Sequence, residues 1–267
     1  MRKANRGDAQ LRITVSEEKG VRYLHFGTEW VQGAMRVRQP WNLELDYSRH
    51  MMAWLLFNDA PERVLQIGLG AGSLTKFVHR SLPDTELTVV ENSPSVVAVA
   101  RGQFRLPADD ERLEIVIDDG QAFVSQPRLK RYFSILQIDV FDQNARGPVL
   151  DSLEFYEASR RVLAPGGIMA VNLFGDVPSY RRNYERILAA FDGRVLVLPP
   201  LEAGNVIVLG FQAPLVESQS DILATWGELR ARAGPVEERF GLNAHGWING
   251  LKVSAAKSLG DGLIGDG

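Results

Sequence analysis

A strict alternation of strand and helix patterns begins at residue 63, and it constrains the fold of this 267-residue chain more than any other feature. Short apolar runs typical of buried strands alternate with segments of helical periodicity. The expected strands cover residues 63–69, 86–91, 113–118, 132–139, 167–174, 194–200 and 205–211, and the expected helices cover 73–82, 94–104, 152–163 and 180–191. Residues 44–57, ahead of this alternation, also have helical periodicity and predict one more helix. Repeated strand–helix–strand units predict a parallel sheet with helices on both faces.

The end of this alternation departs from the parallel pattern. Only four residues, LEAG at 201–204, separate the last two strands, which is too short for a crossover helix, so these strands should pair antiparallel. A mostly parallel seven-stranded sheet with one antiparallel hairpin resembles the Rossmann-like α/β fold of class I S-adenosylmethionine-dependent methyltransferases. We predict this catalytic domain over residues 44–213. A small N-terminal β-strand unit precedes it in residues 1–43, and a C-terminal helix and glycine-rich tail pack on it in residues 214–267.

Composition excludes several functional classes. With 45% hydrophobic and 24% charged residues and a net charge of −3, the chain is typical of a soluble globular protein and has no basic excess that would suggest a nucleic-acid partner. It has no cysteine, and its four histidines are scattered, so we expect no disulfide and no metal site. No apolar run approaches the length of a membrane span. We therefore expect a cytoplasmic protein without membrane contact.

A glycine-rich turn follows the first strand of the alternation, in the stretch RVLQIGLGAGSL at residues 63–74. Gly68, Gly70 and Gly72 lack side chains where the strand turns into a helix, so the backbone can approach a ligand at the helix N-terminus. Ser73 stands where a dinucleotide-binding turn has its third glycine, and the pattern is closer to that of a nucleoside sulfonium site. Glu91 ends the next strand, where a carboxylate can accept hydrogen bonds from both ribose hydroxyls. These features predict a nucleoside site.

Acidic residues also follow the third and fourth strands of the sheet. Asp118 and Asp119 precede Gly120, where an acid can accept a hydrogen bond from an adenine amino group, although an Asp-Gly pair also forms a turn without any ligand. Asp139 and Asp142 come just after the strand at 132–139. The loops after the first and fourth strands face each other where the strand order reverses, so these aspartates should share a cleft with the glycine turn. Two carboxylates there suit a cationic ligand or deprotonation of an amine, or serve only as a turn and helix cap.

Five stretches together resemble the spermidine synthase (polyamine aminopropyltransferase) family over roughly residues 20–212: VLQIGLGAGSL, VVENSPSVVAVAR, RLEIVIDDGQAFV, DVFD and EFYEASRRVLAPGGIMAVNL. The resemblance implies that decarboxylated S-adenosylmethionine binds as co-substrate, with no prosthetic group, and that a diamine such as putrescine attacks its aminopropyl carbon. Methylthioadenosine would leave. By resemblance Asp139 is the base, and Asp142 holds the diamine or the aminopropyl ammonium.

The same resemblance implies roles at the nucleoside site and an oligomeric state. Glu91 would hold the ribose and Asp119 the adenine, with Gly120 beside it, while Gln32 of the N-terminal β unit would contact the nucleoside ligand. The family also implies a homodimer.

The sequence departs from the family pattern near the expected amine site. Ala71 replaces an aspartate that binds the amino end of the aminopropyl arm, and Tyr47, Arg49 and His50 lie in a different register from the family's tyrosine–histidine pair. An arginine there would repel a polyamine. Two alternatives therefore stay open. One is a methyltransferase that uses intact S-adenosylmethionine, and the other is a nucleoside-binding protein without catalysis.

Overall fold

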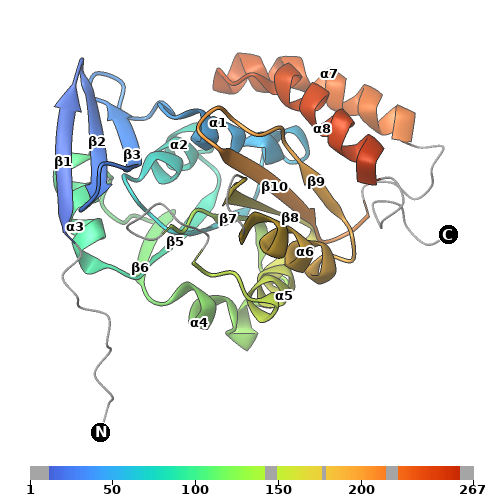
Figure 1. Ribbon diagram of the computed structural model, residues 1–267, viewed down its shortest axis with the longest axis horizontal. Coiled ribbons are helices and arrows are strands. Elements are labelled where there is room, and N and C mark those ends of the chain that lie inside the picture. The colour runs from blue at the N-terminus through green and yellow to red at the C-terminus, as the bar shows by residue number, and fades with distance from the viewer. Residues whose placement is uncertain (1–11, 142–148, 176–178, 215–221, 259–267) are drawn as a thin grey trace, which may run out of the picture.

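Seven strands form one sheet in the order β6-β5-β4-β7-β8-β10-β9 in the computed structural model, which describes residues 12–141, 149–175, 179–214 and 222–258 (Figure 1). The strands are β4 (Arg63–Ile67), β5 (Glu86–Glu91), β6 (Leu113–Ile117), β7 (Phe133–Ile138), β8 (Leu163–Phe174), β9 (Val195–Val197) and β10 (Asn205–Phe211). The strands β4 to β8 run parallel, whereas β10 pairs antiparallel with both β8 and β9. The predicted Rossmann-like fold is confirmed, including its closing hairpin.

Helices cover both faces of this sheet, as the alternating pattern predicts (Figure 1). One face packs against α2 (Ser73–Ser81), α3 (Pro94–Gln103), the 3₁₀ helix η1 (Ala53–Leu56), α7 (Ile222–Phe240) and α8 (Ala244–Ser258). The other packs against α4 (Gly120–Val124), α5 (Leu153–Val162) and α6 (Ser179–Ala190). Neighbouring strand residues serve opposite faces: Val64 and Ile135 lie in the first core, Leu65 and Leu136 in the second. Burial on both faces explains the continuous apolar runs of these strands.

The N-terminal unit is a separate antiparallel sheet of β1 (Ile13–Glu18), β2 (Val21–Phe26) and β3 (Val31–Arg36) (Figure 1). Lys19 and Gly20 join β1 to β2, and both have positive φ, at 51° and 77°, as a tight hairpin turn requires. The sheet packs against the glycine turn after β4, because a Cβ added to Gly33 of β3 would lie 2.7 Å from the Cβ of Ala71. This contact makes β3 a wall beside the predicted nucleoside site.

The helical periodicity of residues 44–57 produces a broken element. It forms α1 (Asp46–His50) and then η1, with Met52 between them at φ −89° and ψ 3°. Every side chain from residue 51 to residue 56 is fully buried. Because all six side chains are buried, this segment has no side that faces solvent. It therefore differs from a regular amphipathic helix, which packs on a core through one apolar stripe.

The C-terminal region has two helices, α7 and α8, where the sequence predicts one. Asn243 precedes α8, and its Oδ1 accepts a hydrogen bond from the Gly246 amide at 2.9 Å, a helix cap that the sequence analysis missed. The predicted glycine-rich tail, from residue 259 on, lies outside the described residues. None of the described helices is long and apolar enough to cross a membrane.

Candidate active site

A cavity of about 890 Å³ opens along the edge of the sheet where the parallel strands end and β10 begins. β4 and β7 are neighbours at its centre, where the strand order reverses, which is where ligands bind in sheets of this type. Residues of β3 and α1 line the cavity from the N-terminal side, Tyr47 among them. The cavity brings together these predicted site residues: Gln32, Gly68, Gly70, Glu91, Asp119, Gly120 and Asp139.

The glycine turn contributes two of its three predicted residues to the cavity wall. Gly68, Gly70 and Gly72 all have positive φ, at 90°, 52° and 68°. A Cβ on Gly68 would lie 2.1 Å from the carbonyl oxygen of Asp139, so only glycine allows β4 and β7 to end this close together. Gly72 is not among the residues that line the cavity. It packs against Leu106, because a Cβ on Gly72 would lie 3.0 Å from Leu106 Cδ1.

Glu91 lies at the end of β5 with 8% of its surface exposed. Its Oε2 accepts a hydrogen bond from the Leu69 amide at 3.0 Å, and its Oε1 accepts one from the Ser93 amide at 2.9 Å. Burial raises the pKa of Glu91, and these amide donors partly offset the increase. The carboxylate is therefore fixed beside the glycine turn, with lone pairs on both oxygens left for ribose hydroxyls.

Asp119 caps helix α4 and also lines the cavity. Its Oδ1 accepts a hydrogen bond from the Ala122 amide at 2.8 Å, and the Asp119 amide donates to Asp118 Oδ1 at 2.8 Å. A Cβ on Gly120 would lie 2.6 Å from Ile67 Cγ2, so glycine keeps the α4 backbone close to β4. The cap and the predicted adenine contact are compatible, because the cap uses one carboxylate oxygen and leaves the other.

Asp139 follows β7 and receives hydrogen bonds from two side chains. Asn172 Nδ2, on β8, donates to Asp139 Oδ1 at 3.0 Å, and the Tyr47 hydroxyl on α1 also donates to this carboxylate. Burial raises the pKa of Asp139, and the two donors lower it in part. Burial and the Asp139 charge raise the pKa of Tyr47 well above its ordinary value. An aspartate of raised pKa beside a protonated phenol is a better proton acceptor for an amine than an exposed aspartate.

The sequence patterns do not predict which side chains hold this carboxylate. Tyr47 contacts Asp139 although it lies in a different register from the family pattern. Asn172 and Asn205 were assigned no role, yet Asn205 Nδ2 donates to Asn172 Oδ1 at 3.0 Å. Each of these asparagines belongs to an otherwise apolar strand segment of the sequence. That pattern indicates a buried amide, and a buried amide needs a hydrogen-bond partner.

The predicted partner of Asp139, Asp142, lies outside the described residues. Ala71 packs with Leu24, Met35 and Phe104 in a small apolar cluster and is 3% exposed. Its methyl group therefore serves the contact between the glycine turn and the N-terminal sheet.

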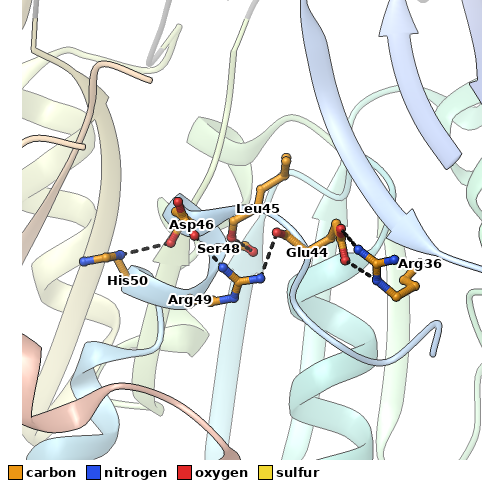
Figure 2. A network of polar contacts seen from close by, with 7 residues as sticks. All are labelled: Arg36, Glu44, Leu45, Asp46, Ser48, Arg49 and His50. Atoms are coloured by element: carbon orange, nitrogen blue, oxygen red, sulfur yellow. Dashed lines mark hydrogen bonds and ion pairs between the residues drawn. The ribbon is translucent and has the colours of Figure 1, made fainter. Parts of the chain in front are cut away.

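Arg49 has its charge paired within its own turn (Figure 2). Its guanidinium forms an ion pair with Asp46 and donates to the carbonyl oxygen of Glu44 at 2.9 Å. The Glu44 side chain is in turn paired with Arg36, whose Nε lies 3.0 Å from Glu44 Oε2 (Figure 2). Asp46 lines the cavity, and its carboxylate neutralises the charge of Arg49. The repulsion of a polyamine that the sequence predicts from Arg49 is thereby reduced.

Solved structures share this fold at low sequence identity. A probable spermidine synthase from Corynebacterium glutamicum aligns with a TM-score of 0.67 at 20% identity, covering 96% of this chain and 93% of that one. A spermidine synthase in complex with the transition-state analogue AdoDATO gives 0.66 at 20% identity, covering 93% and 88%. Human methyltransferase-like protein 13 in complex with SAH gives 0.56 at 23% identity, covering 70% and 91%. The fold is thus one that spermidine synthases and methyltransferases share.

Sequence relatives define the family within this class. The family model of the spermine/spermidine synthase domain matches residues 44–184. The polyamine aminopropyltransferase of Chromobacterium violaceum is 38% identical over 257 residues, covering 96% of this chain and 95% of its own. The polyamine aminopropyltransferase of Neisseria meningitidis serogroup A is 37% identical over 243 residues, covering 91% and 89%. The chain belongs to the spermine/spermidine synthase family.

Proposed function

We propose that this protein is a polyamine aminopropyltransferase. It transfers the aminopropyl group of decarboxylated S-adenosylmethionine, its co-substrate, to a diamine such as putrescine and releases methylthioadenosine. The observation that carries the proposal is the position of Asp139, whose carbonyl oxygen lies against Gly68 of the glycine turn and whose carboxylate is held by Asn172 and Tyr47. A proton acceptor and a nucleoside-type turn therefore share one cavity.

The nucleoside end of the cavity would hold the adenosine part of the co-substrate. Glu91 accepts hydrogen bonds from the ribose hydroxyls, and Asp119 accepts one from the adenine amino group. Gln32 contacts the ligand from β3, which lies over the glycine turn. The sulfonium then lies near Gly68 and Gly70, which both line the cavity.

The amine end would carry out the proton transfer. A diamine nitrogen attacks the aminopropyl carbon bonded to the sulfonium, and the carbon–sulfur bond breaks with its electron pair on sulfur. Before this attack, the ammonium form of the same nitrogen passes a proton to Asp139, because only the neutral amine has the lone pair that forms the new bond, and the raised pKa of Asp139 suits this transfer. Tyr47 stays protonated and keeps its hydrogen bond to the carboxylate. Asp142 would hold the second ammonium of the diamine or that of the aminopropyl arm.

A methyltransferase that uses intact S-adenosylmethionine is the second candidate. Ala71 favours it, because a methyl group replaces the acid that would bind the aminopropyl ammonium, and this methyl group packs against the N-terminal sheet. Loss of one charge-assisted hydrogen bond costs about 1.5 to 3 kcal/mol, enough to change which donor binds better.

The same family membership supports a cytoplasmic homodimer. The N-terminal sheet carries exposed apolar side chains suited to a subunit contact, with Trp30 57% and Val31 42% exposed. Sedimentation equilibrium should then give twice the chain mass of 29.7 kDa. A species at the chain mass itself would contradict the dimer.

Product analysis tests the proposed activity. Wild-type protein should convert decarboxylated S-adenosylmethionine and putrescine to spermidine and methylthioadenosine in equal amounts. The variant Asp139→Asn, tested in parallel, should form neither at a comparable rate. Transfer of a methyl group from intact S-adenosylmethionine, with no spermidine formed, would support the second candidate instead.

A further inference from the structure

We propose that Asn205 is a positioning residue, which fixes the side-chain amide of Asn172 so that its NH₂ group, and not its oxygen, faces Asp139. The inference rests on the proposed role of Asp139 as the base. It concerns two buried amides that line the cavity and extend from the base to the start of β10.

The hydrogen bonds form a directed chain. Asn205 Nδ2 donates to Asn172 Oδ1 at 3.0 Å, and Asn172 Nδ2 donates to Asp139 Oδ1 at 3.0 Å. Asn172 is 1% exposed and Asn205 is 8% exposed, so water has little access to either amide. Each link is thus a protein contact whose direction is set by the groups at its two ends.

The backbone holds both asparagines in place. In the β8–β10 register, Asn205 pairs with Phe174 and Asn172 pairs with Ile207, so the two asparagines are diagonal neighbours on one face of the sheet. The turn before β10 is closed by hydrogen bonds from the Leu201 amide to the Asn205 carbonyl at 2.9 Å and from the Gly204 amide to the Leu201 carbonyl at 2.8 Å. The backbone of Asn205 is therefore held by contacts within the chain.

The direction matters because an asparagine amide is nearly symmetric in shape. Its oxygen and its NH₂ group exchange places when the side chain rotates by half a turn, and the two arrangements fit the same space. In the observed orientation Asn172 stabilises the ionised carboxylate of Asp139. In the reversed orientation its oxygen would face the carboxylate, and two acceptors would repel each other. The reversed amide would favour the protonated acid, which cannot take a proton from an ammonium.

Asn205 removes this ambiguity. An NH₂ group at position 205 needs an acceptor, and the oxygen of Asn172 is the atom that meets it. With that oxygen engaged, the NH₂ group of Asn172 is left for Asp139. Neither asparagine titrates, so the pair acts on the base through orientation alone.

Other titratable groups also face Asp139 or its cavity. Tyr47, on α1, contacts the carboxylate directly. Several more line the cavity from the N-terminal sheet, from the segment that leads into α1, from the ends of β5 and β6, and from the turn before β10: Glu29, Glu44, Asp46, Glu91, Asp118, Asp119 and Glu202. All of them are present in each variant below, so the comparison isolates the amide pair.

The first test is the pH profile of kcat/KM for transfer to putrescine. Asn205→Leu keeps the approximate volume and removes the donor, so the acid limb should move to higher pH by about one unit, a tenfold change in the ionised fraction of Asp139 at low pH. Asn205→Asp places an acceptor opposite Asn172 and should move the limb further in the same direction. The KM for the nucleoside donor should stay within about threefold in Asn205→Leu, because the polar groups at the nucleoside end are untouched.

Ile207→Val is the matched control. Ile207 lies on the same strand and face, opposite Asn172, and the loss of one methylene from its side chain perturbs packing without removing an amide hydrogen bond. This variant should leave the acid limb where the wild type has it. If Asn205→Leu does not fold, Asn205→Ala removes the same donor at a smaller packing change. An unmoved acid limb in a folded variant that lacks the donor would overturn the inference.

A second readout needs no activity. The pKa of the Asp139 carboxyl can be followed by carbon-13 NMR of protein labelled at aspartate carboxyls, with the signal assigned by its absence from Asp139→Asn. A higher pKa in Asn205→Leu than in wild type supports the positioning role even if no aminopropyl transfer is found. An equal pKa overturns that role even if transfer is normal. Failure of the proposed function and failure of this inference are therefore distinguishable.

Discussion

The two ends of the cavity are formed by different kinds of groups. The proposed nucleoside end, at β4, β5 and β6, consists of backbone groups and of carboxylates fixed by nearby amides, as the amides of Leu69 and Ser93 fix Glu91. The amine end, at β7, β8 and β10, consists of side chains from distant parts of the chain, with Tyr47, Asn172 and Asn205 arranged around Asp139. In the proposed function, ligand binding would therefore follow from local chain geometry, whereas the reactivity of the proposed base would depend on the tertiary fold.

If the two ends act separately, a change at the proposed base should lower kcat strongly and should alter the affinity for the nucleoside ligand only slightly. Asp139→Asn removes the proton acceptor and should lower kcat by about 100- to 10,000-fold, the usual contribution of a general base. The dissociation constant of methylthioadenosine, measured by calorimetry, should change by less than about threefold. A large loss of methylthioadenosine affinity in this variant would break the comparison, because it would show that the base also holds the nucleoside.

The reverse pattern is expected at the nucleoside end. Glu91→Gln leaves one acceptor oxygen where two now accept the Leu69 and Ser93 amides, so the turn and the ribose contact are both weakened. The dissociation constant of methylthioadenosine should rise about tenfold, in line with the loss of one hydrogen bond to a charged group. At saturating donor, kcat should fall by less than about threefold. A kcat loss as large as that of Asp139→Asn would contradict a purely binding role for Glu91.

Asp119→Asn should have the smallest effect. It separates the two roles of this carboxylate, the observed cap of helix α4 and the proposed contact with adenine. Asparagine is also a good helix cap, so its oxygen can still accept from the Ala122 amide and α4 should stay intact. Its NH₂ group would then face the ligand where adenine needs an acceptor. The affinity for methylthioadenosine should fall about three- to tenfold, while the melting temperature stays unchanged within error. Unchanged affinity would mean that Asp119 serves α4 alone.

The same contrast explains how much of the site the sequence could predict. Gly68, Gly70, Glu91 and Asp119 each lie where an apolar strand ends, and the carboxyl ends of parallel strands share one edge, so the chain order alone places them together. The fold followed from the same alternation of strands and helices.

The amine end could not be predicted in this way. Asn172 lies within β8, and Asn205, 33 residues later, begins β10, so their contact depends on the antiparallel register of these two strands. Tyr47 contacts Asp139 from α1, in a segment that the sequence predicts as one helix over residues 44–57 and that the structure divides into α1 and η1. The cap of α8 by Asn243 is local and could be predicted, because asparagine is a favoured residue just before a helix.

The measurement that tests the central claim most directly is a calorimetric comparison of three ligands with purified protein: decarboxylated S-adenosylmethionine, intact S-adenosylmethionine and methylthioadenosine, each with and without putrescine. For an aminopropyltransferase, we expect the decarboxylated donor to bind more tightly than the intact one and putrescine to strengthen the binding of methylthioadenosine. Equal or tighter binding of intact S-adenosylmethionine, with no effect of putrescine, would contradict this expectation and would identify the cavity as a site for methyl transfer or for nucleoside binding alone.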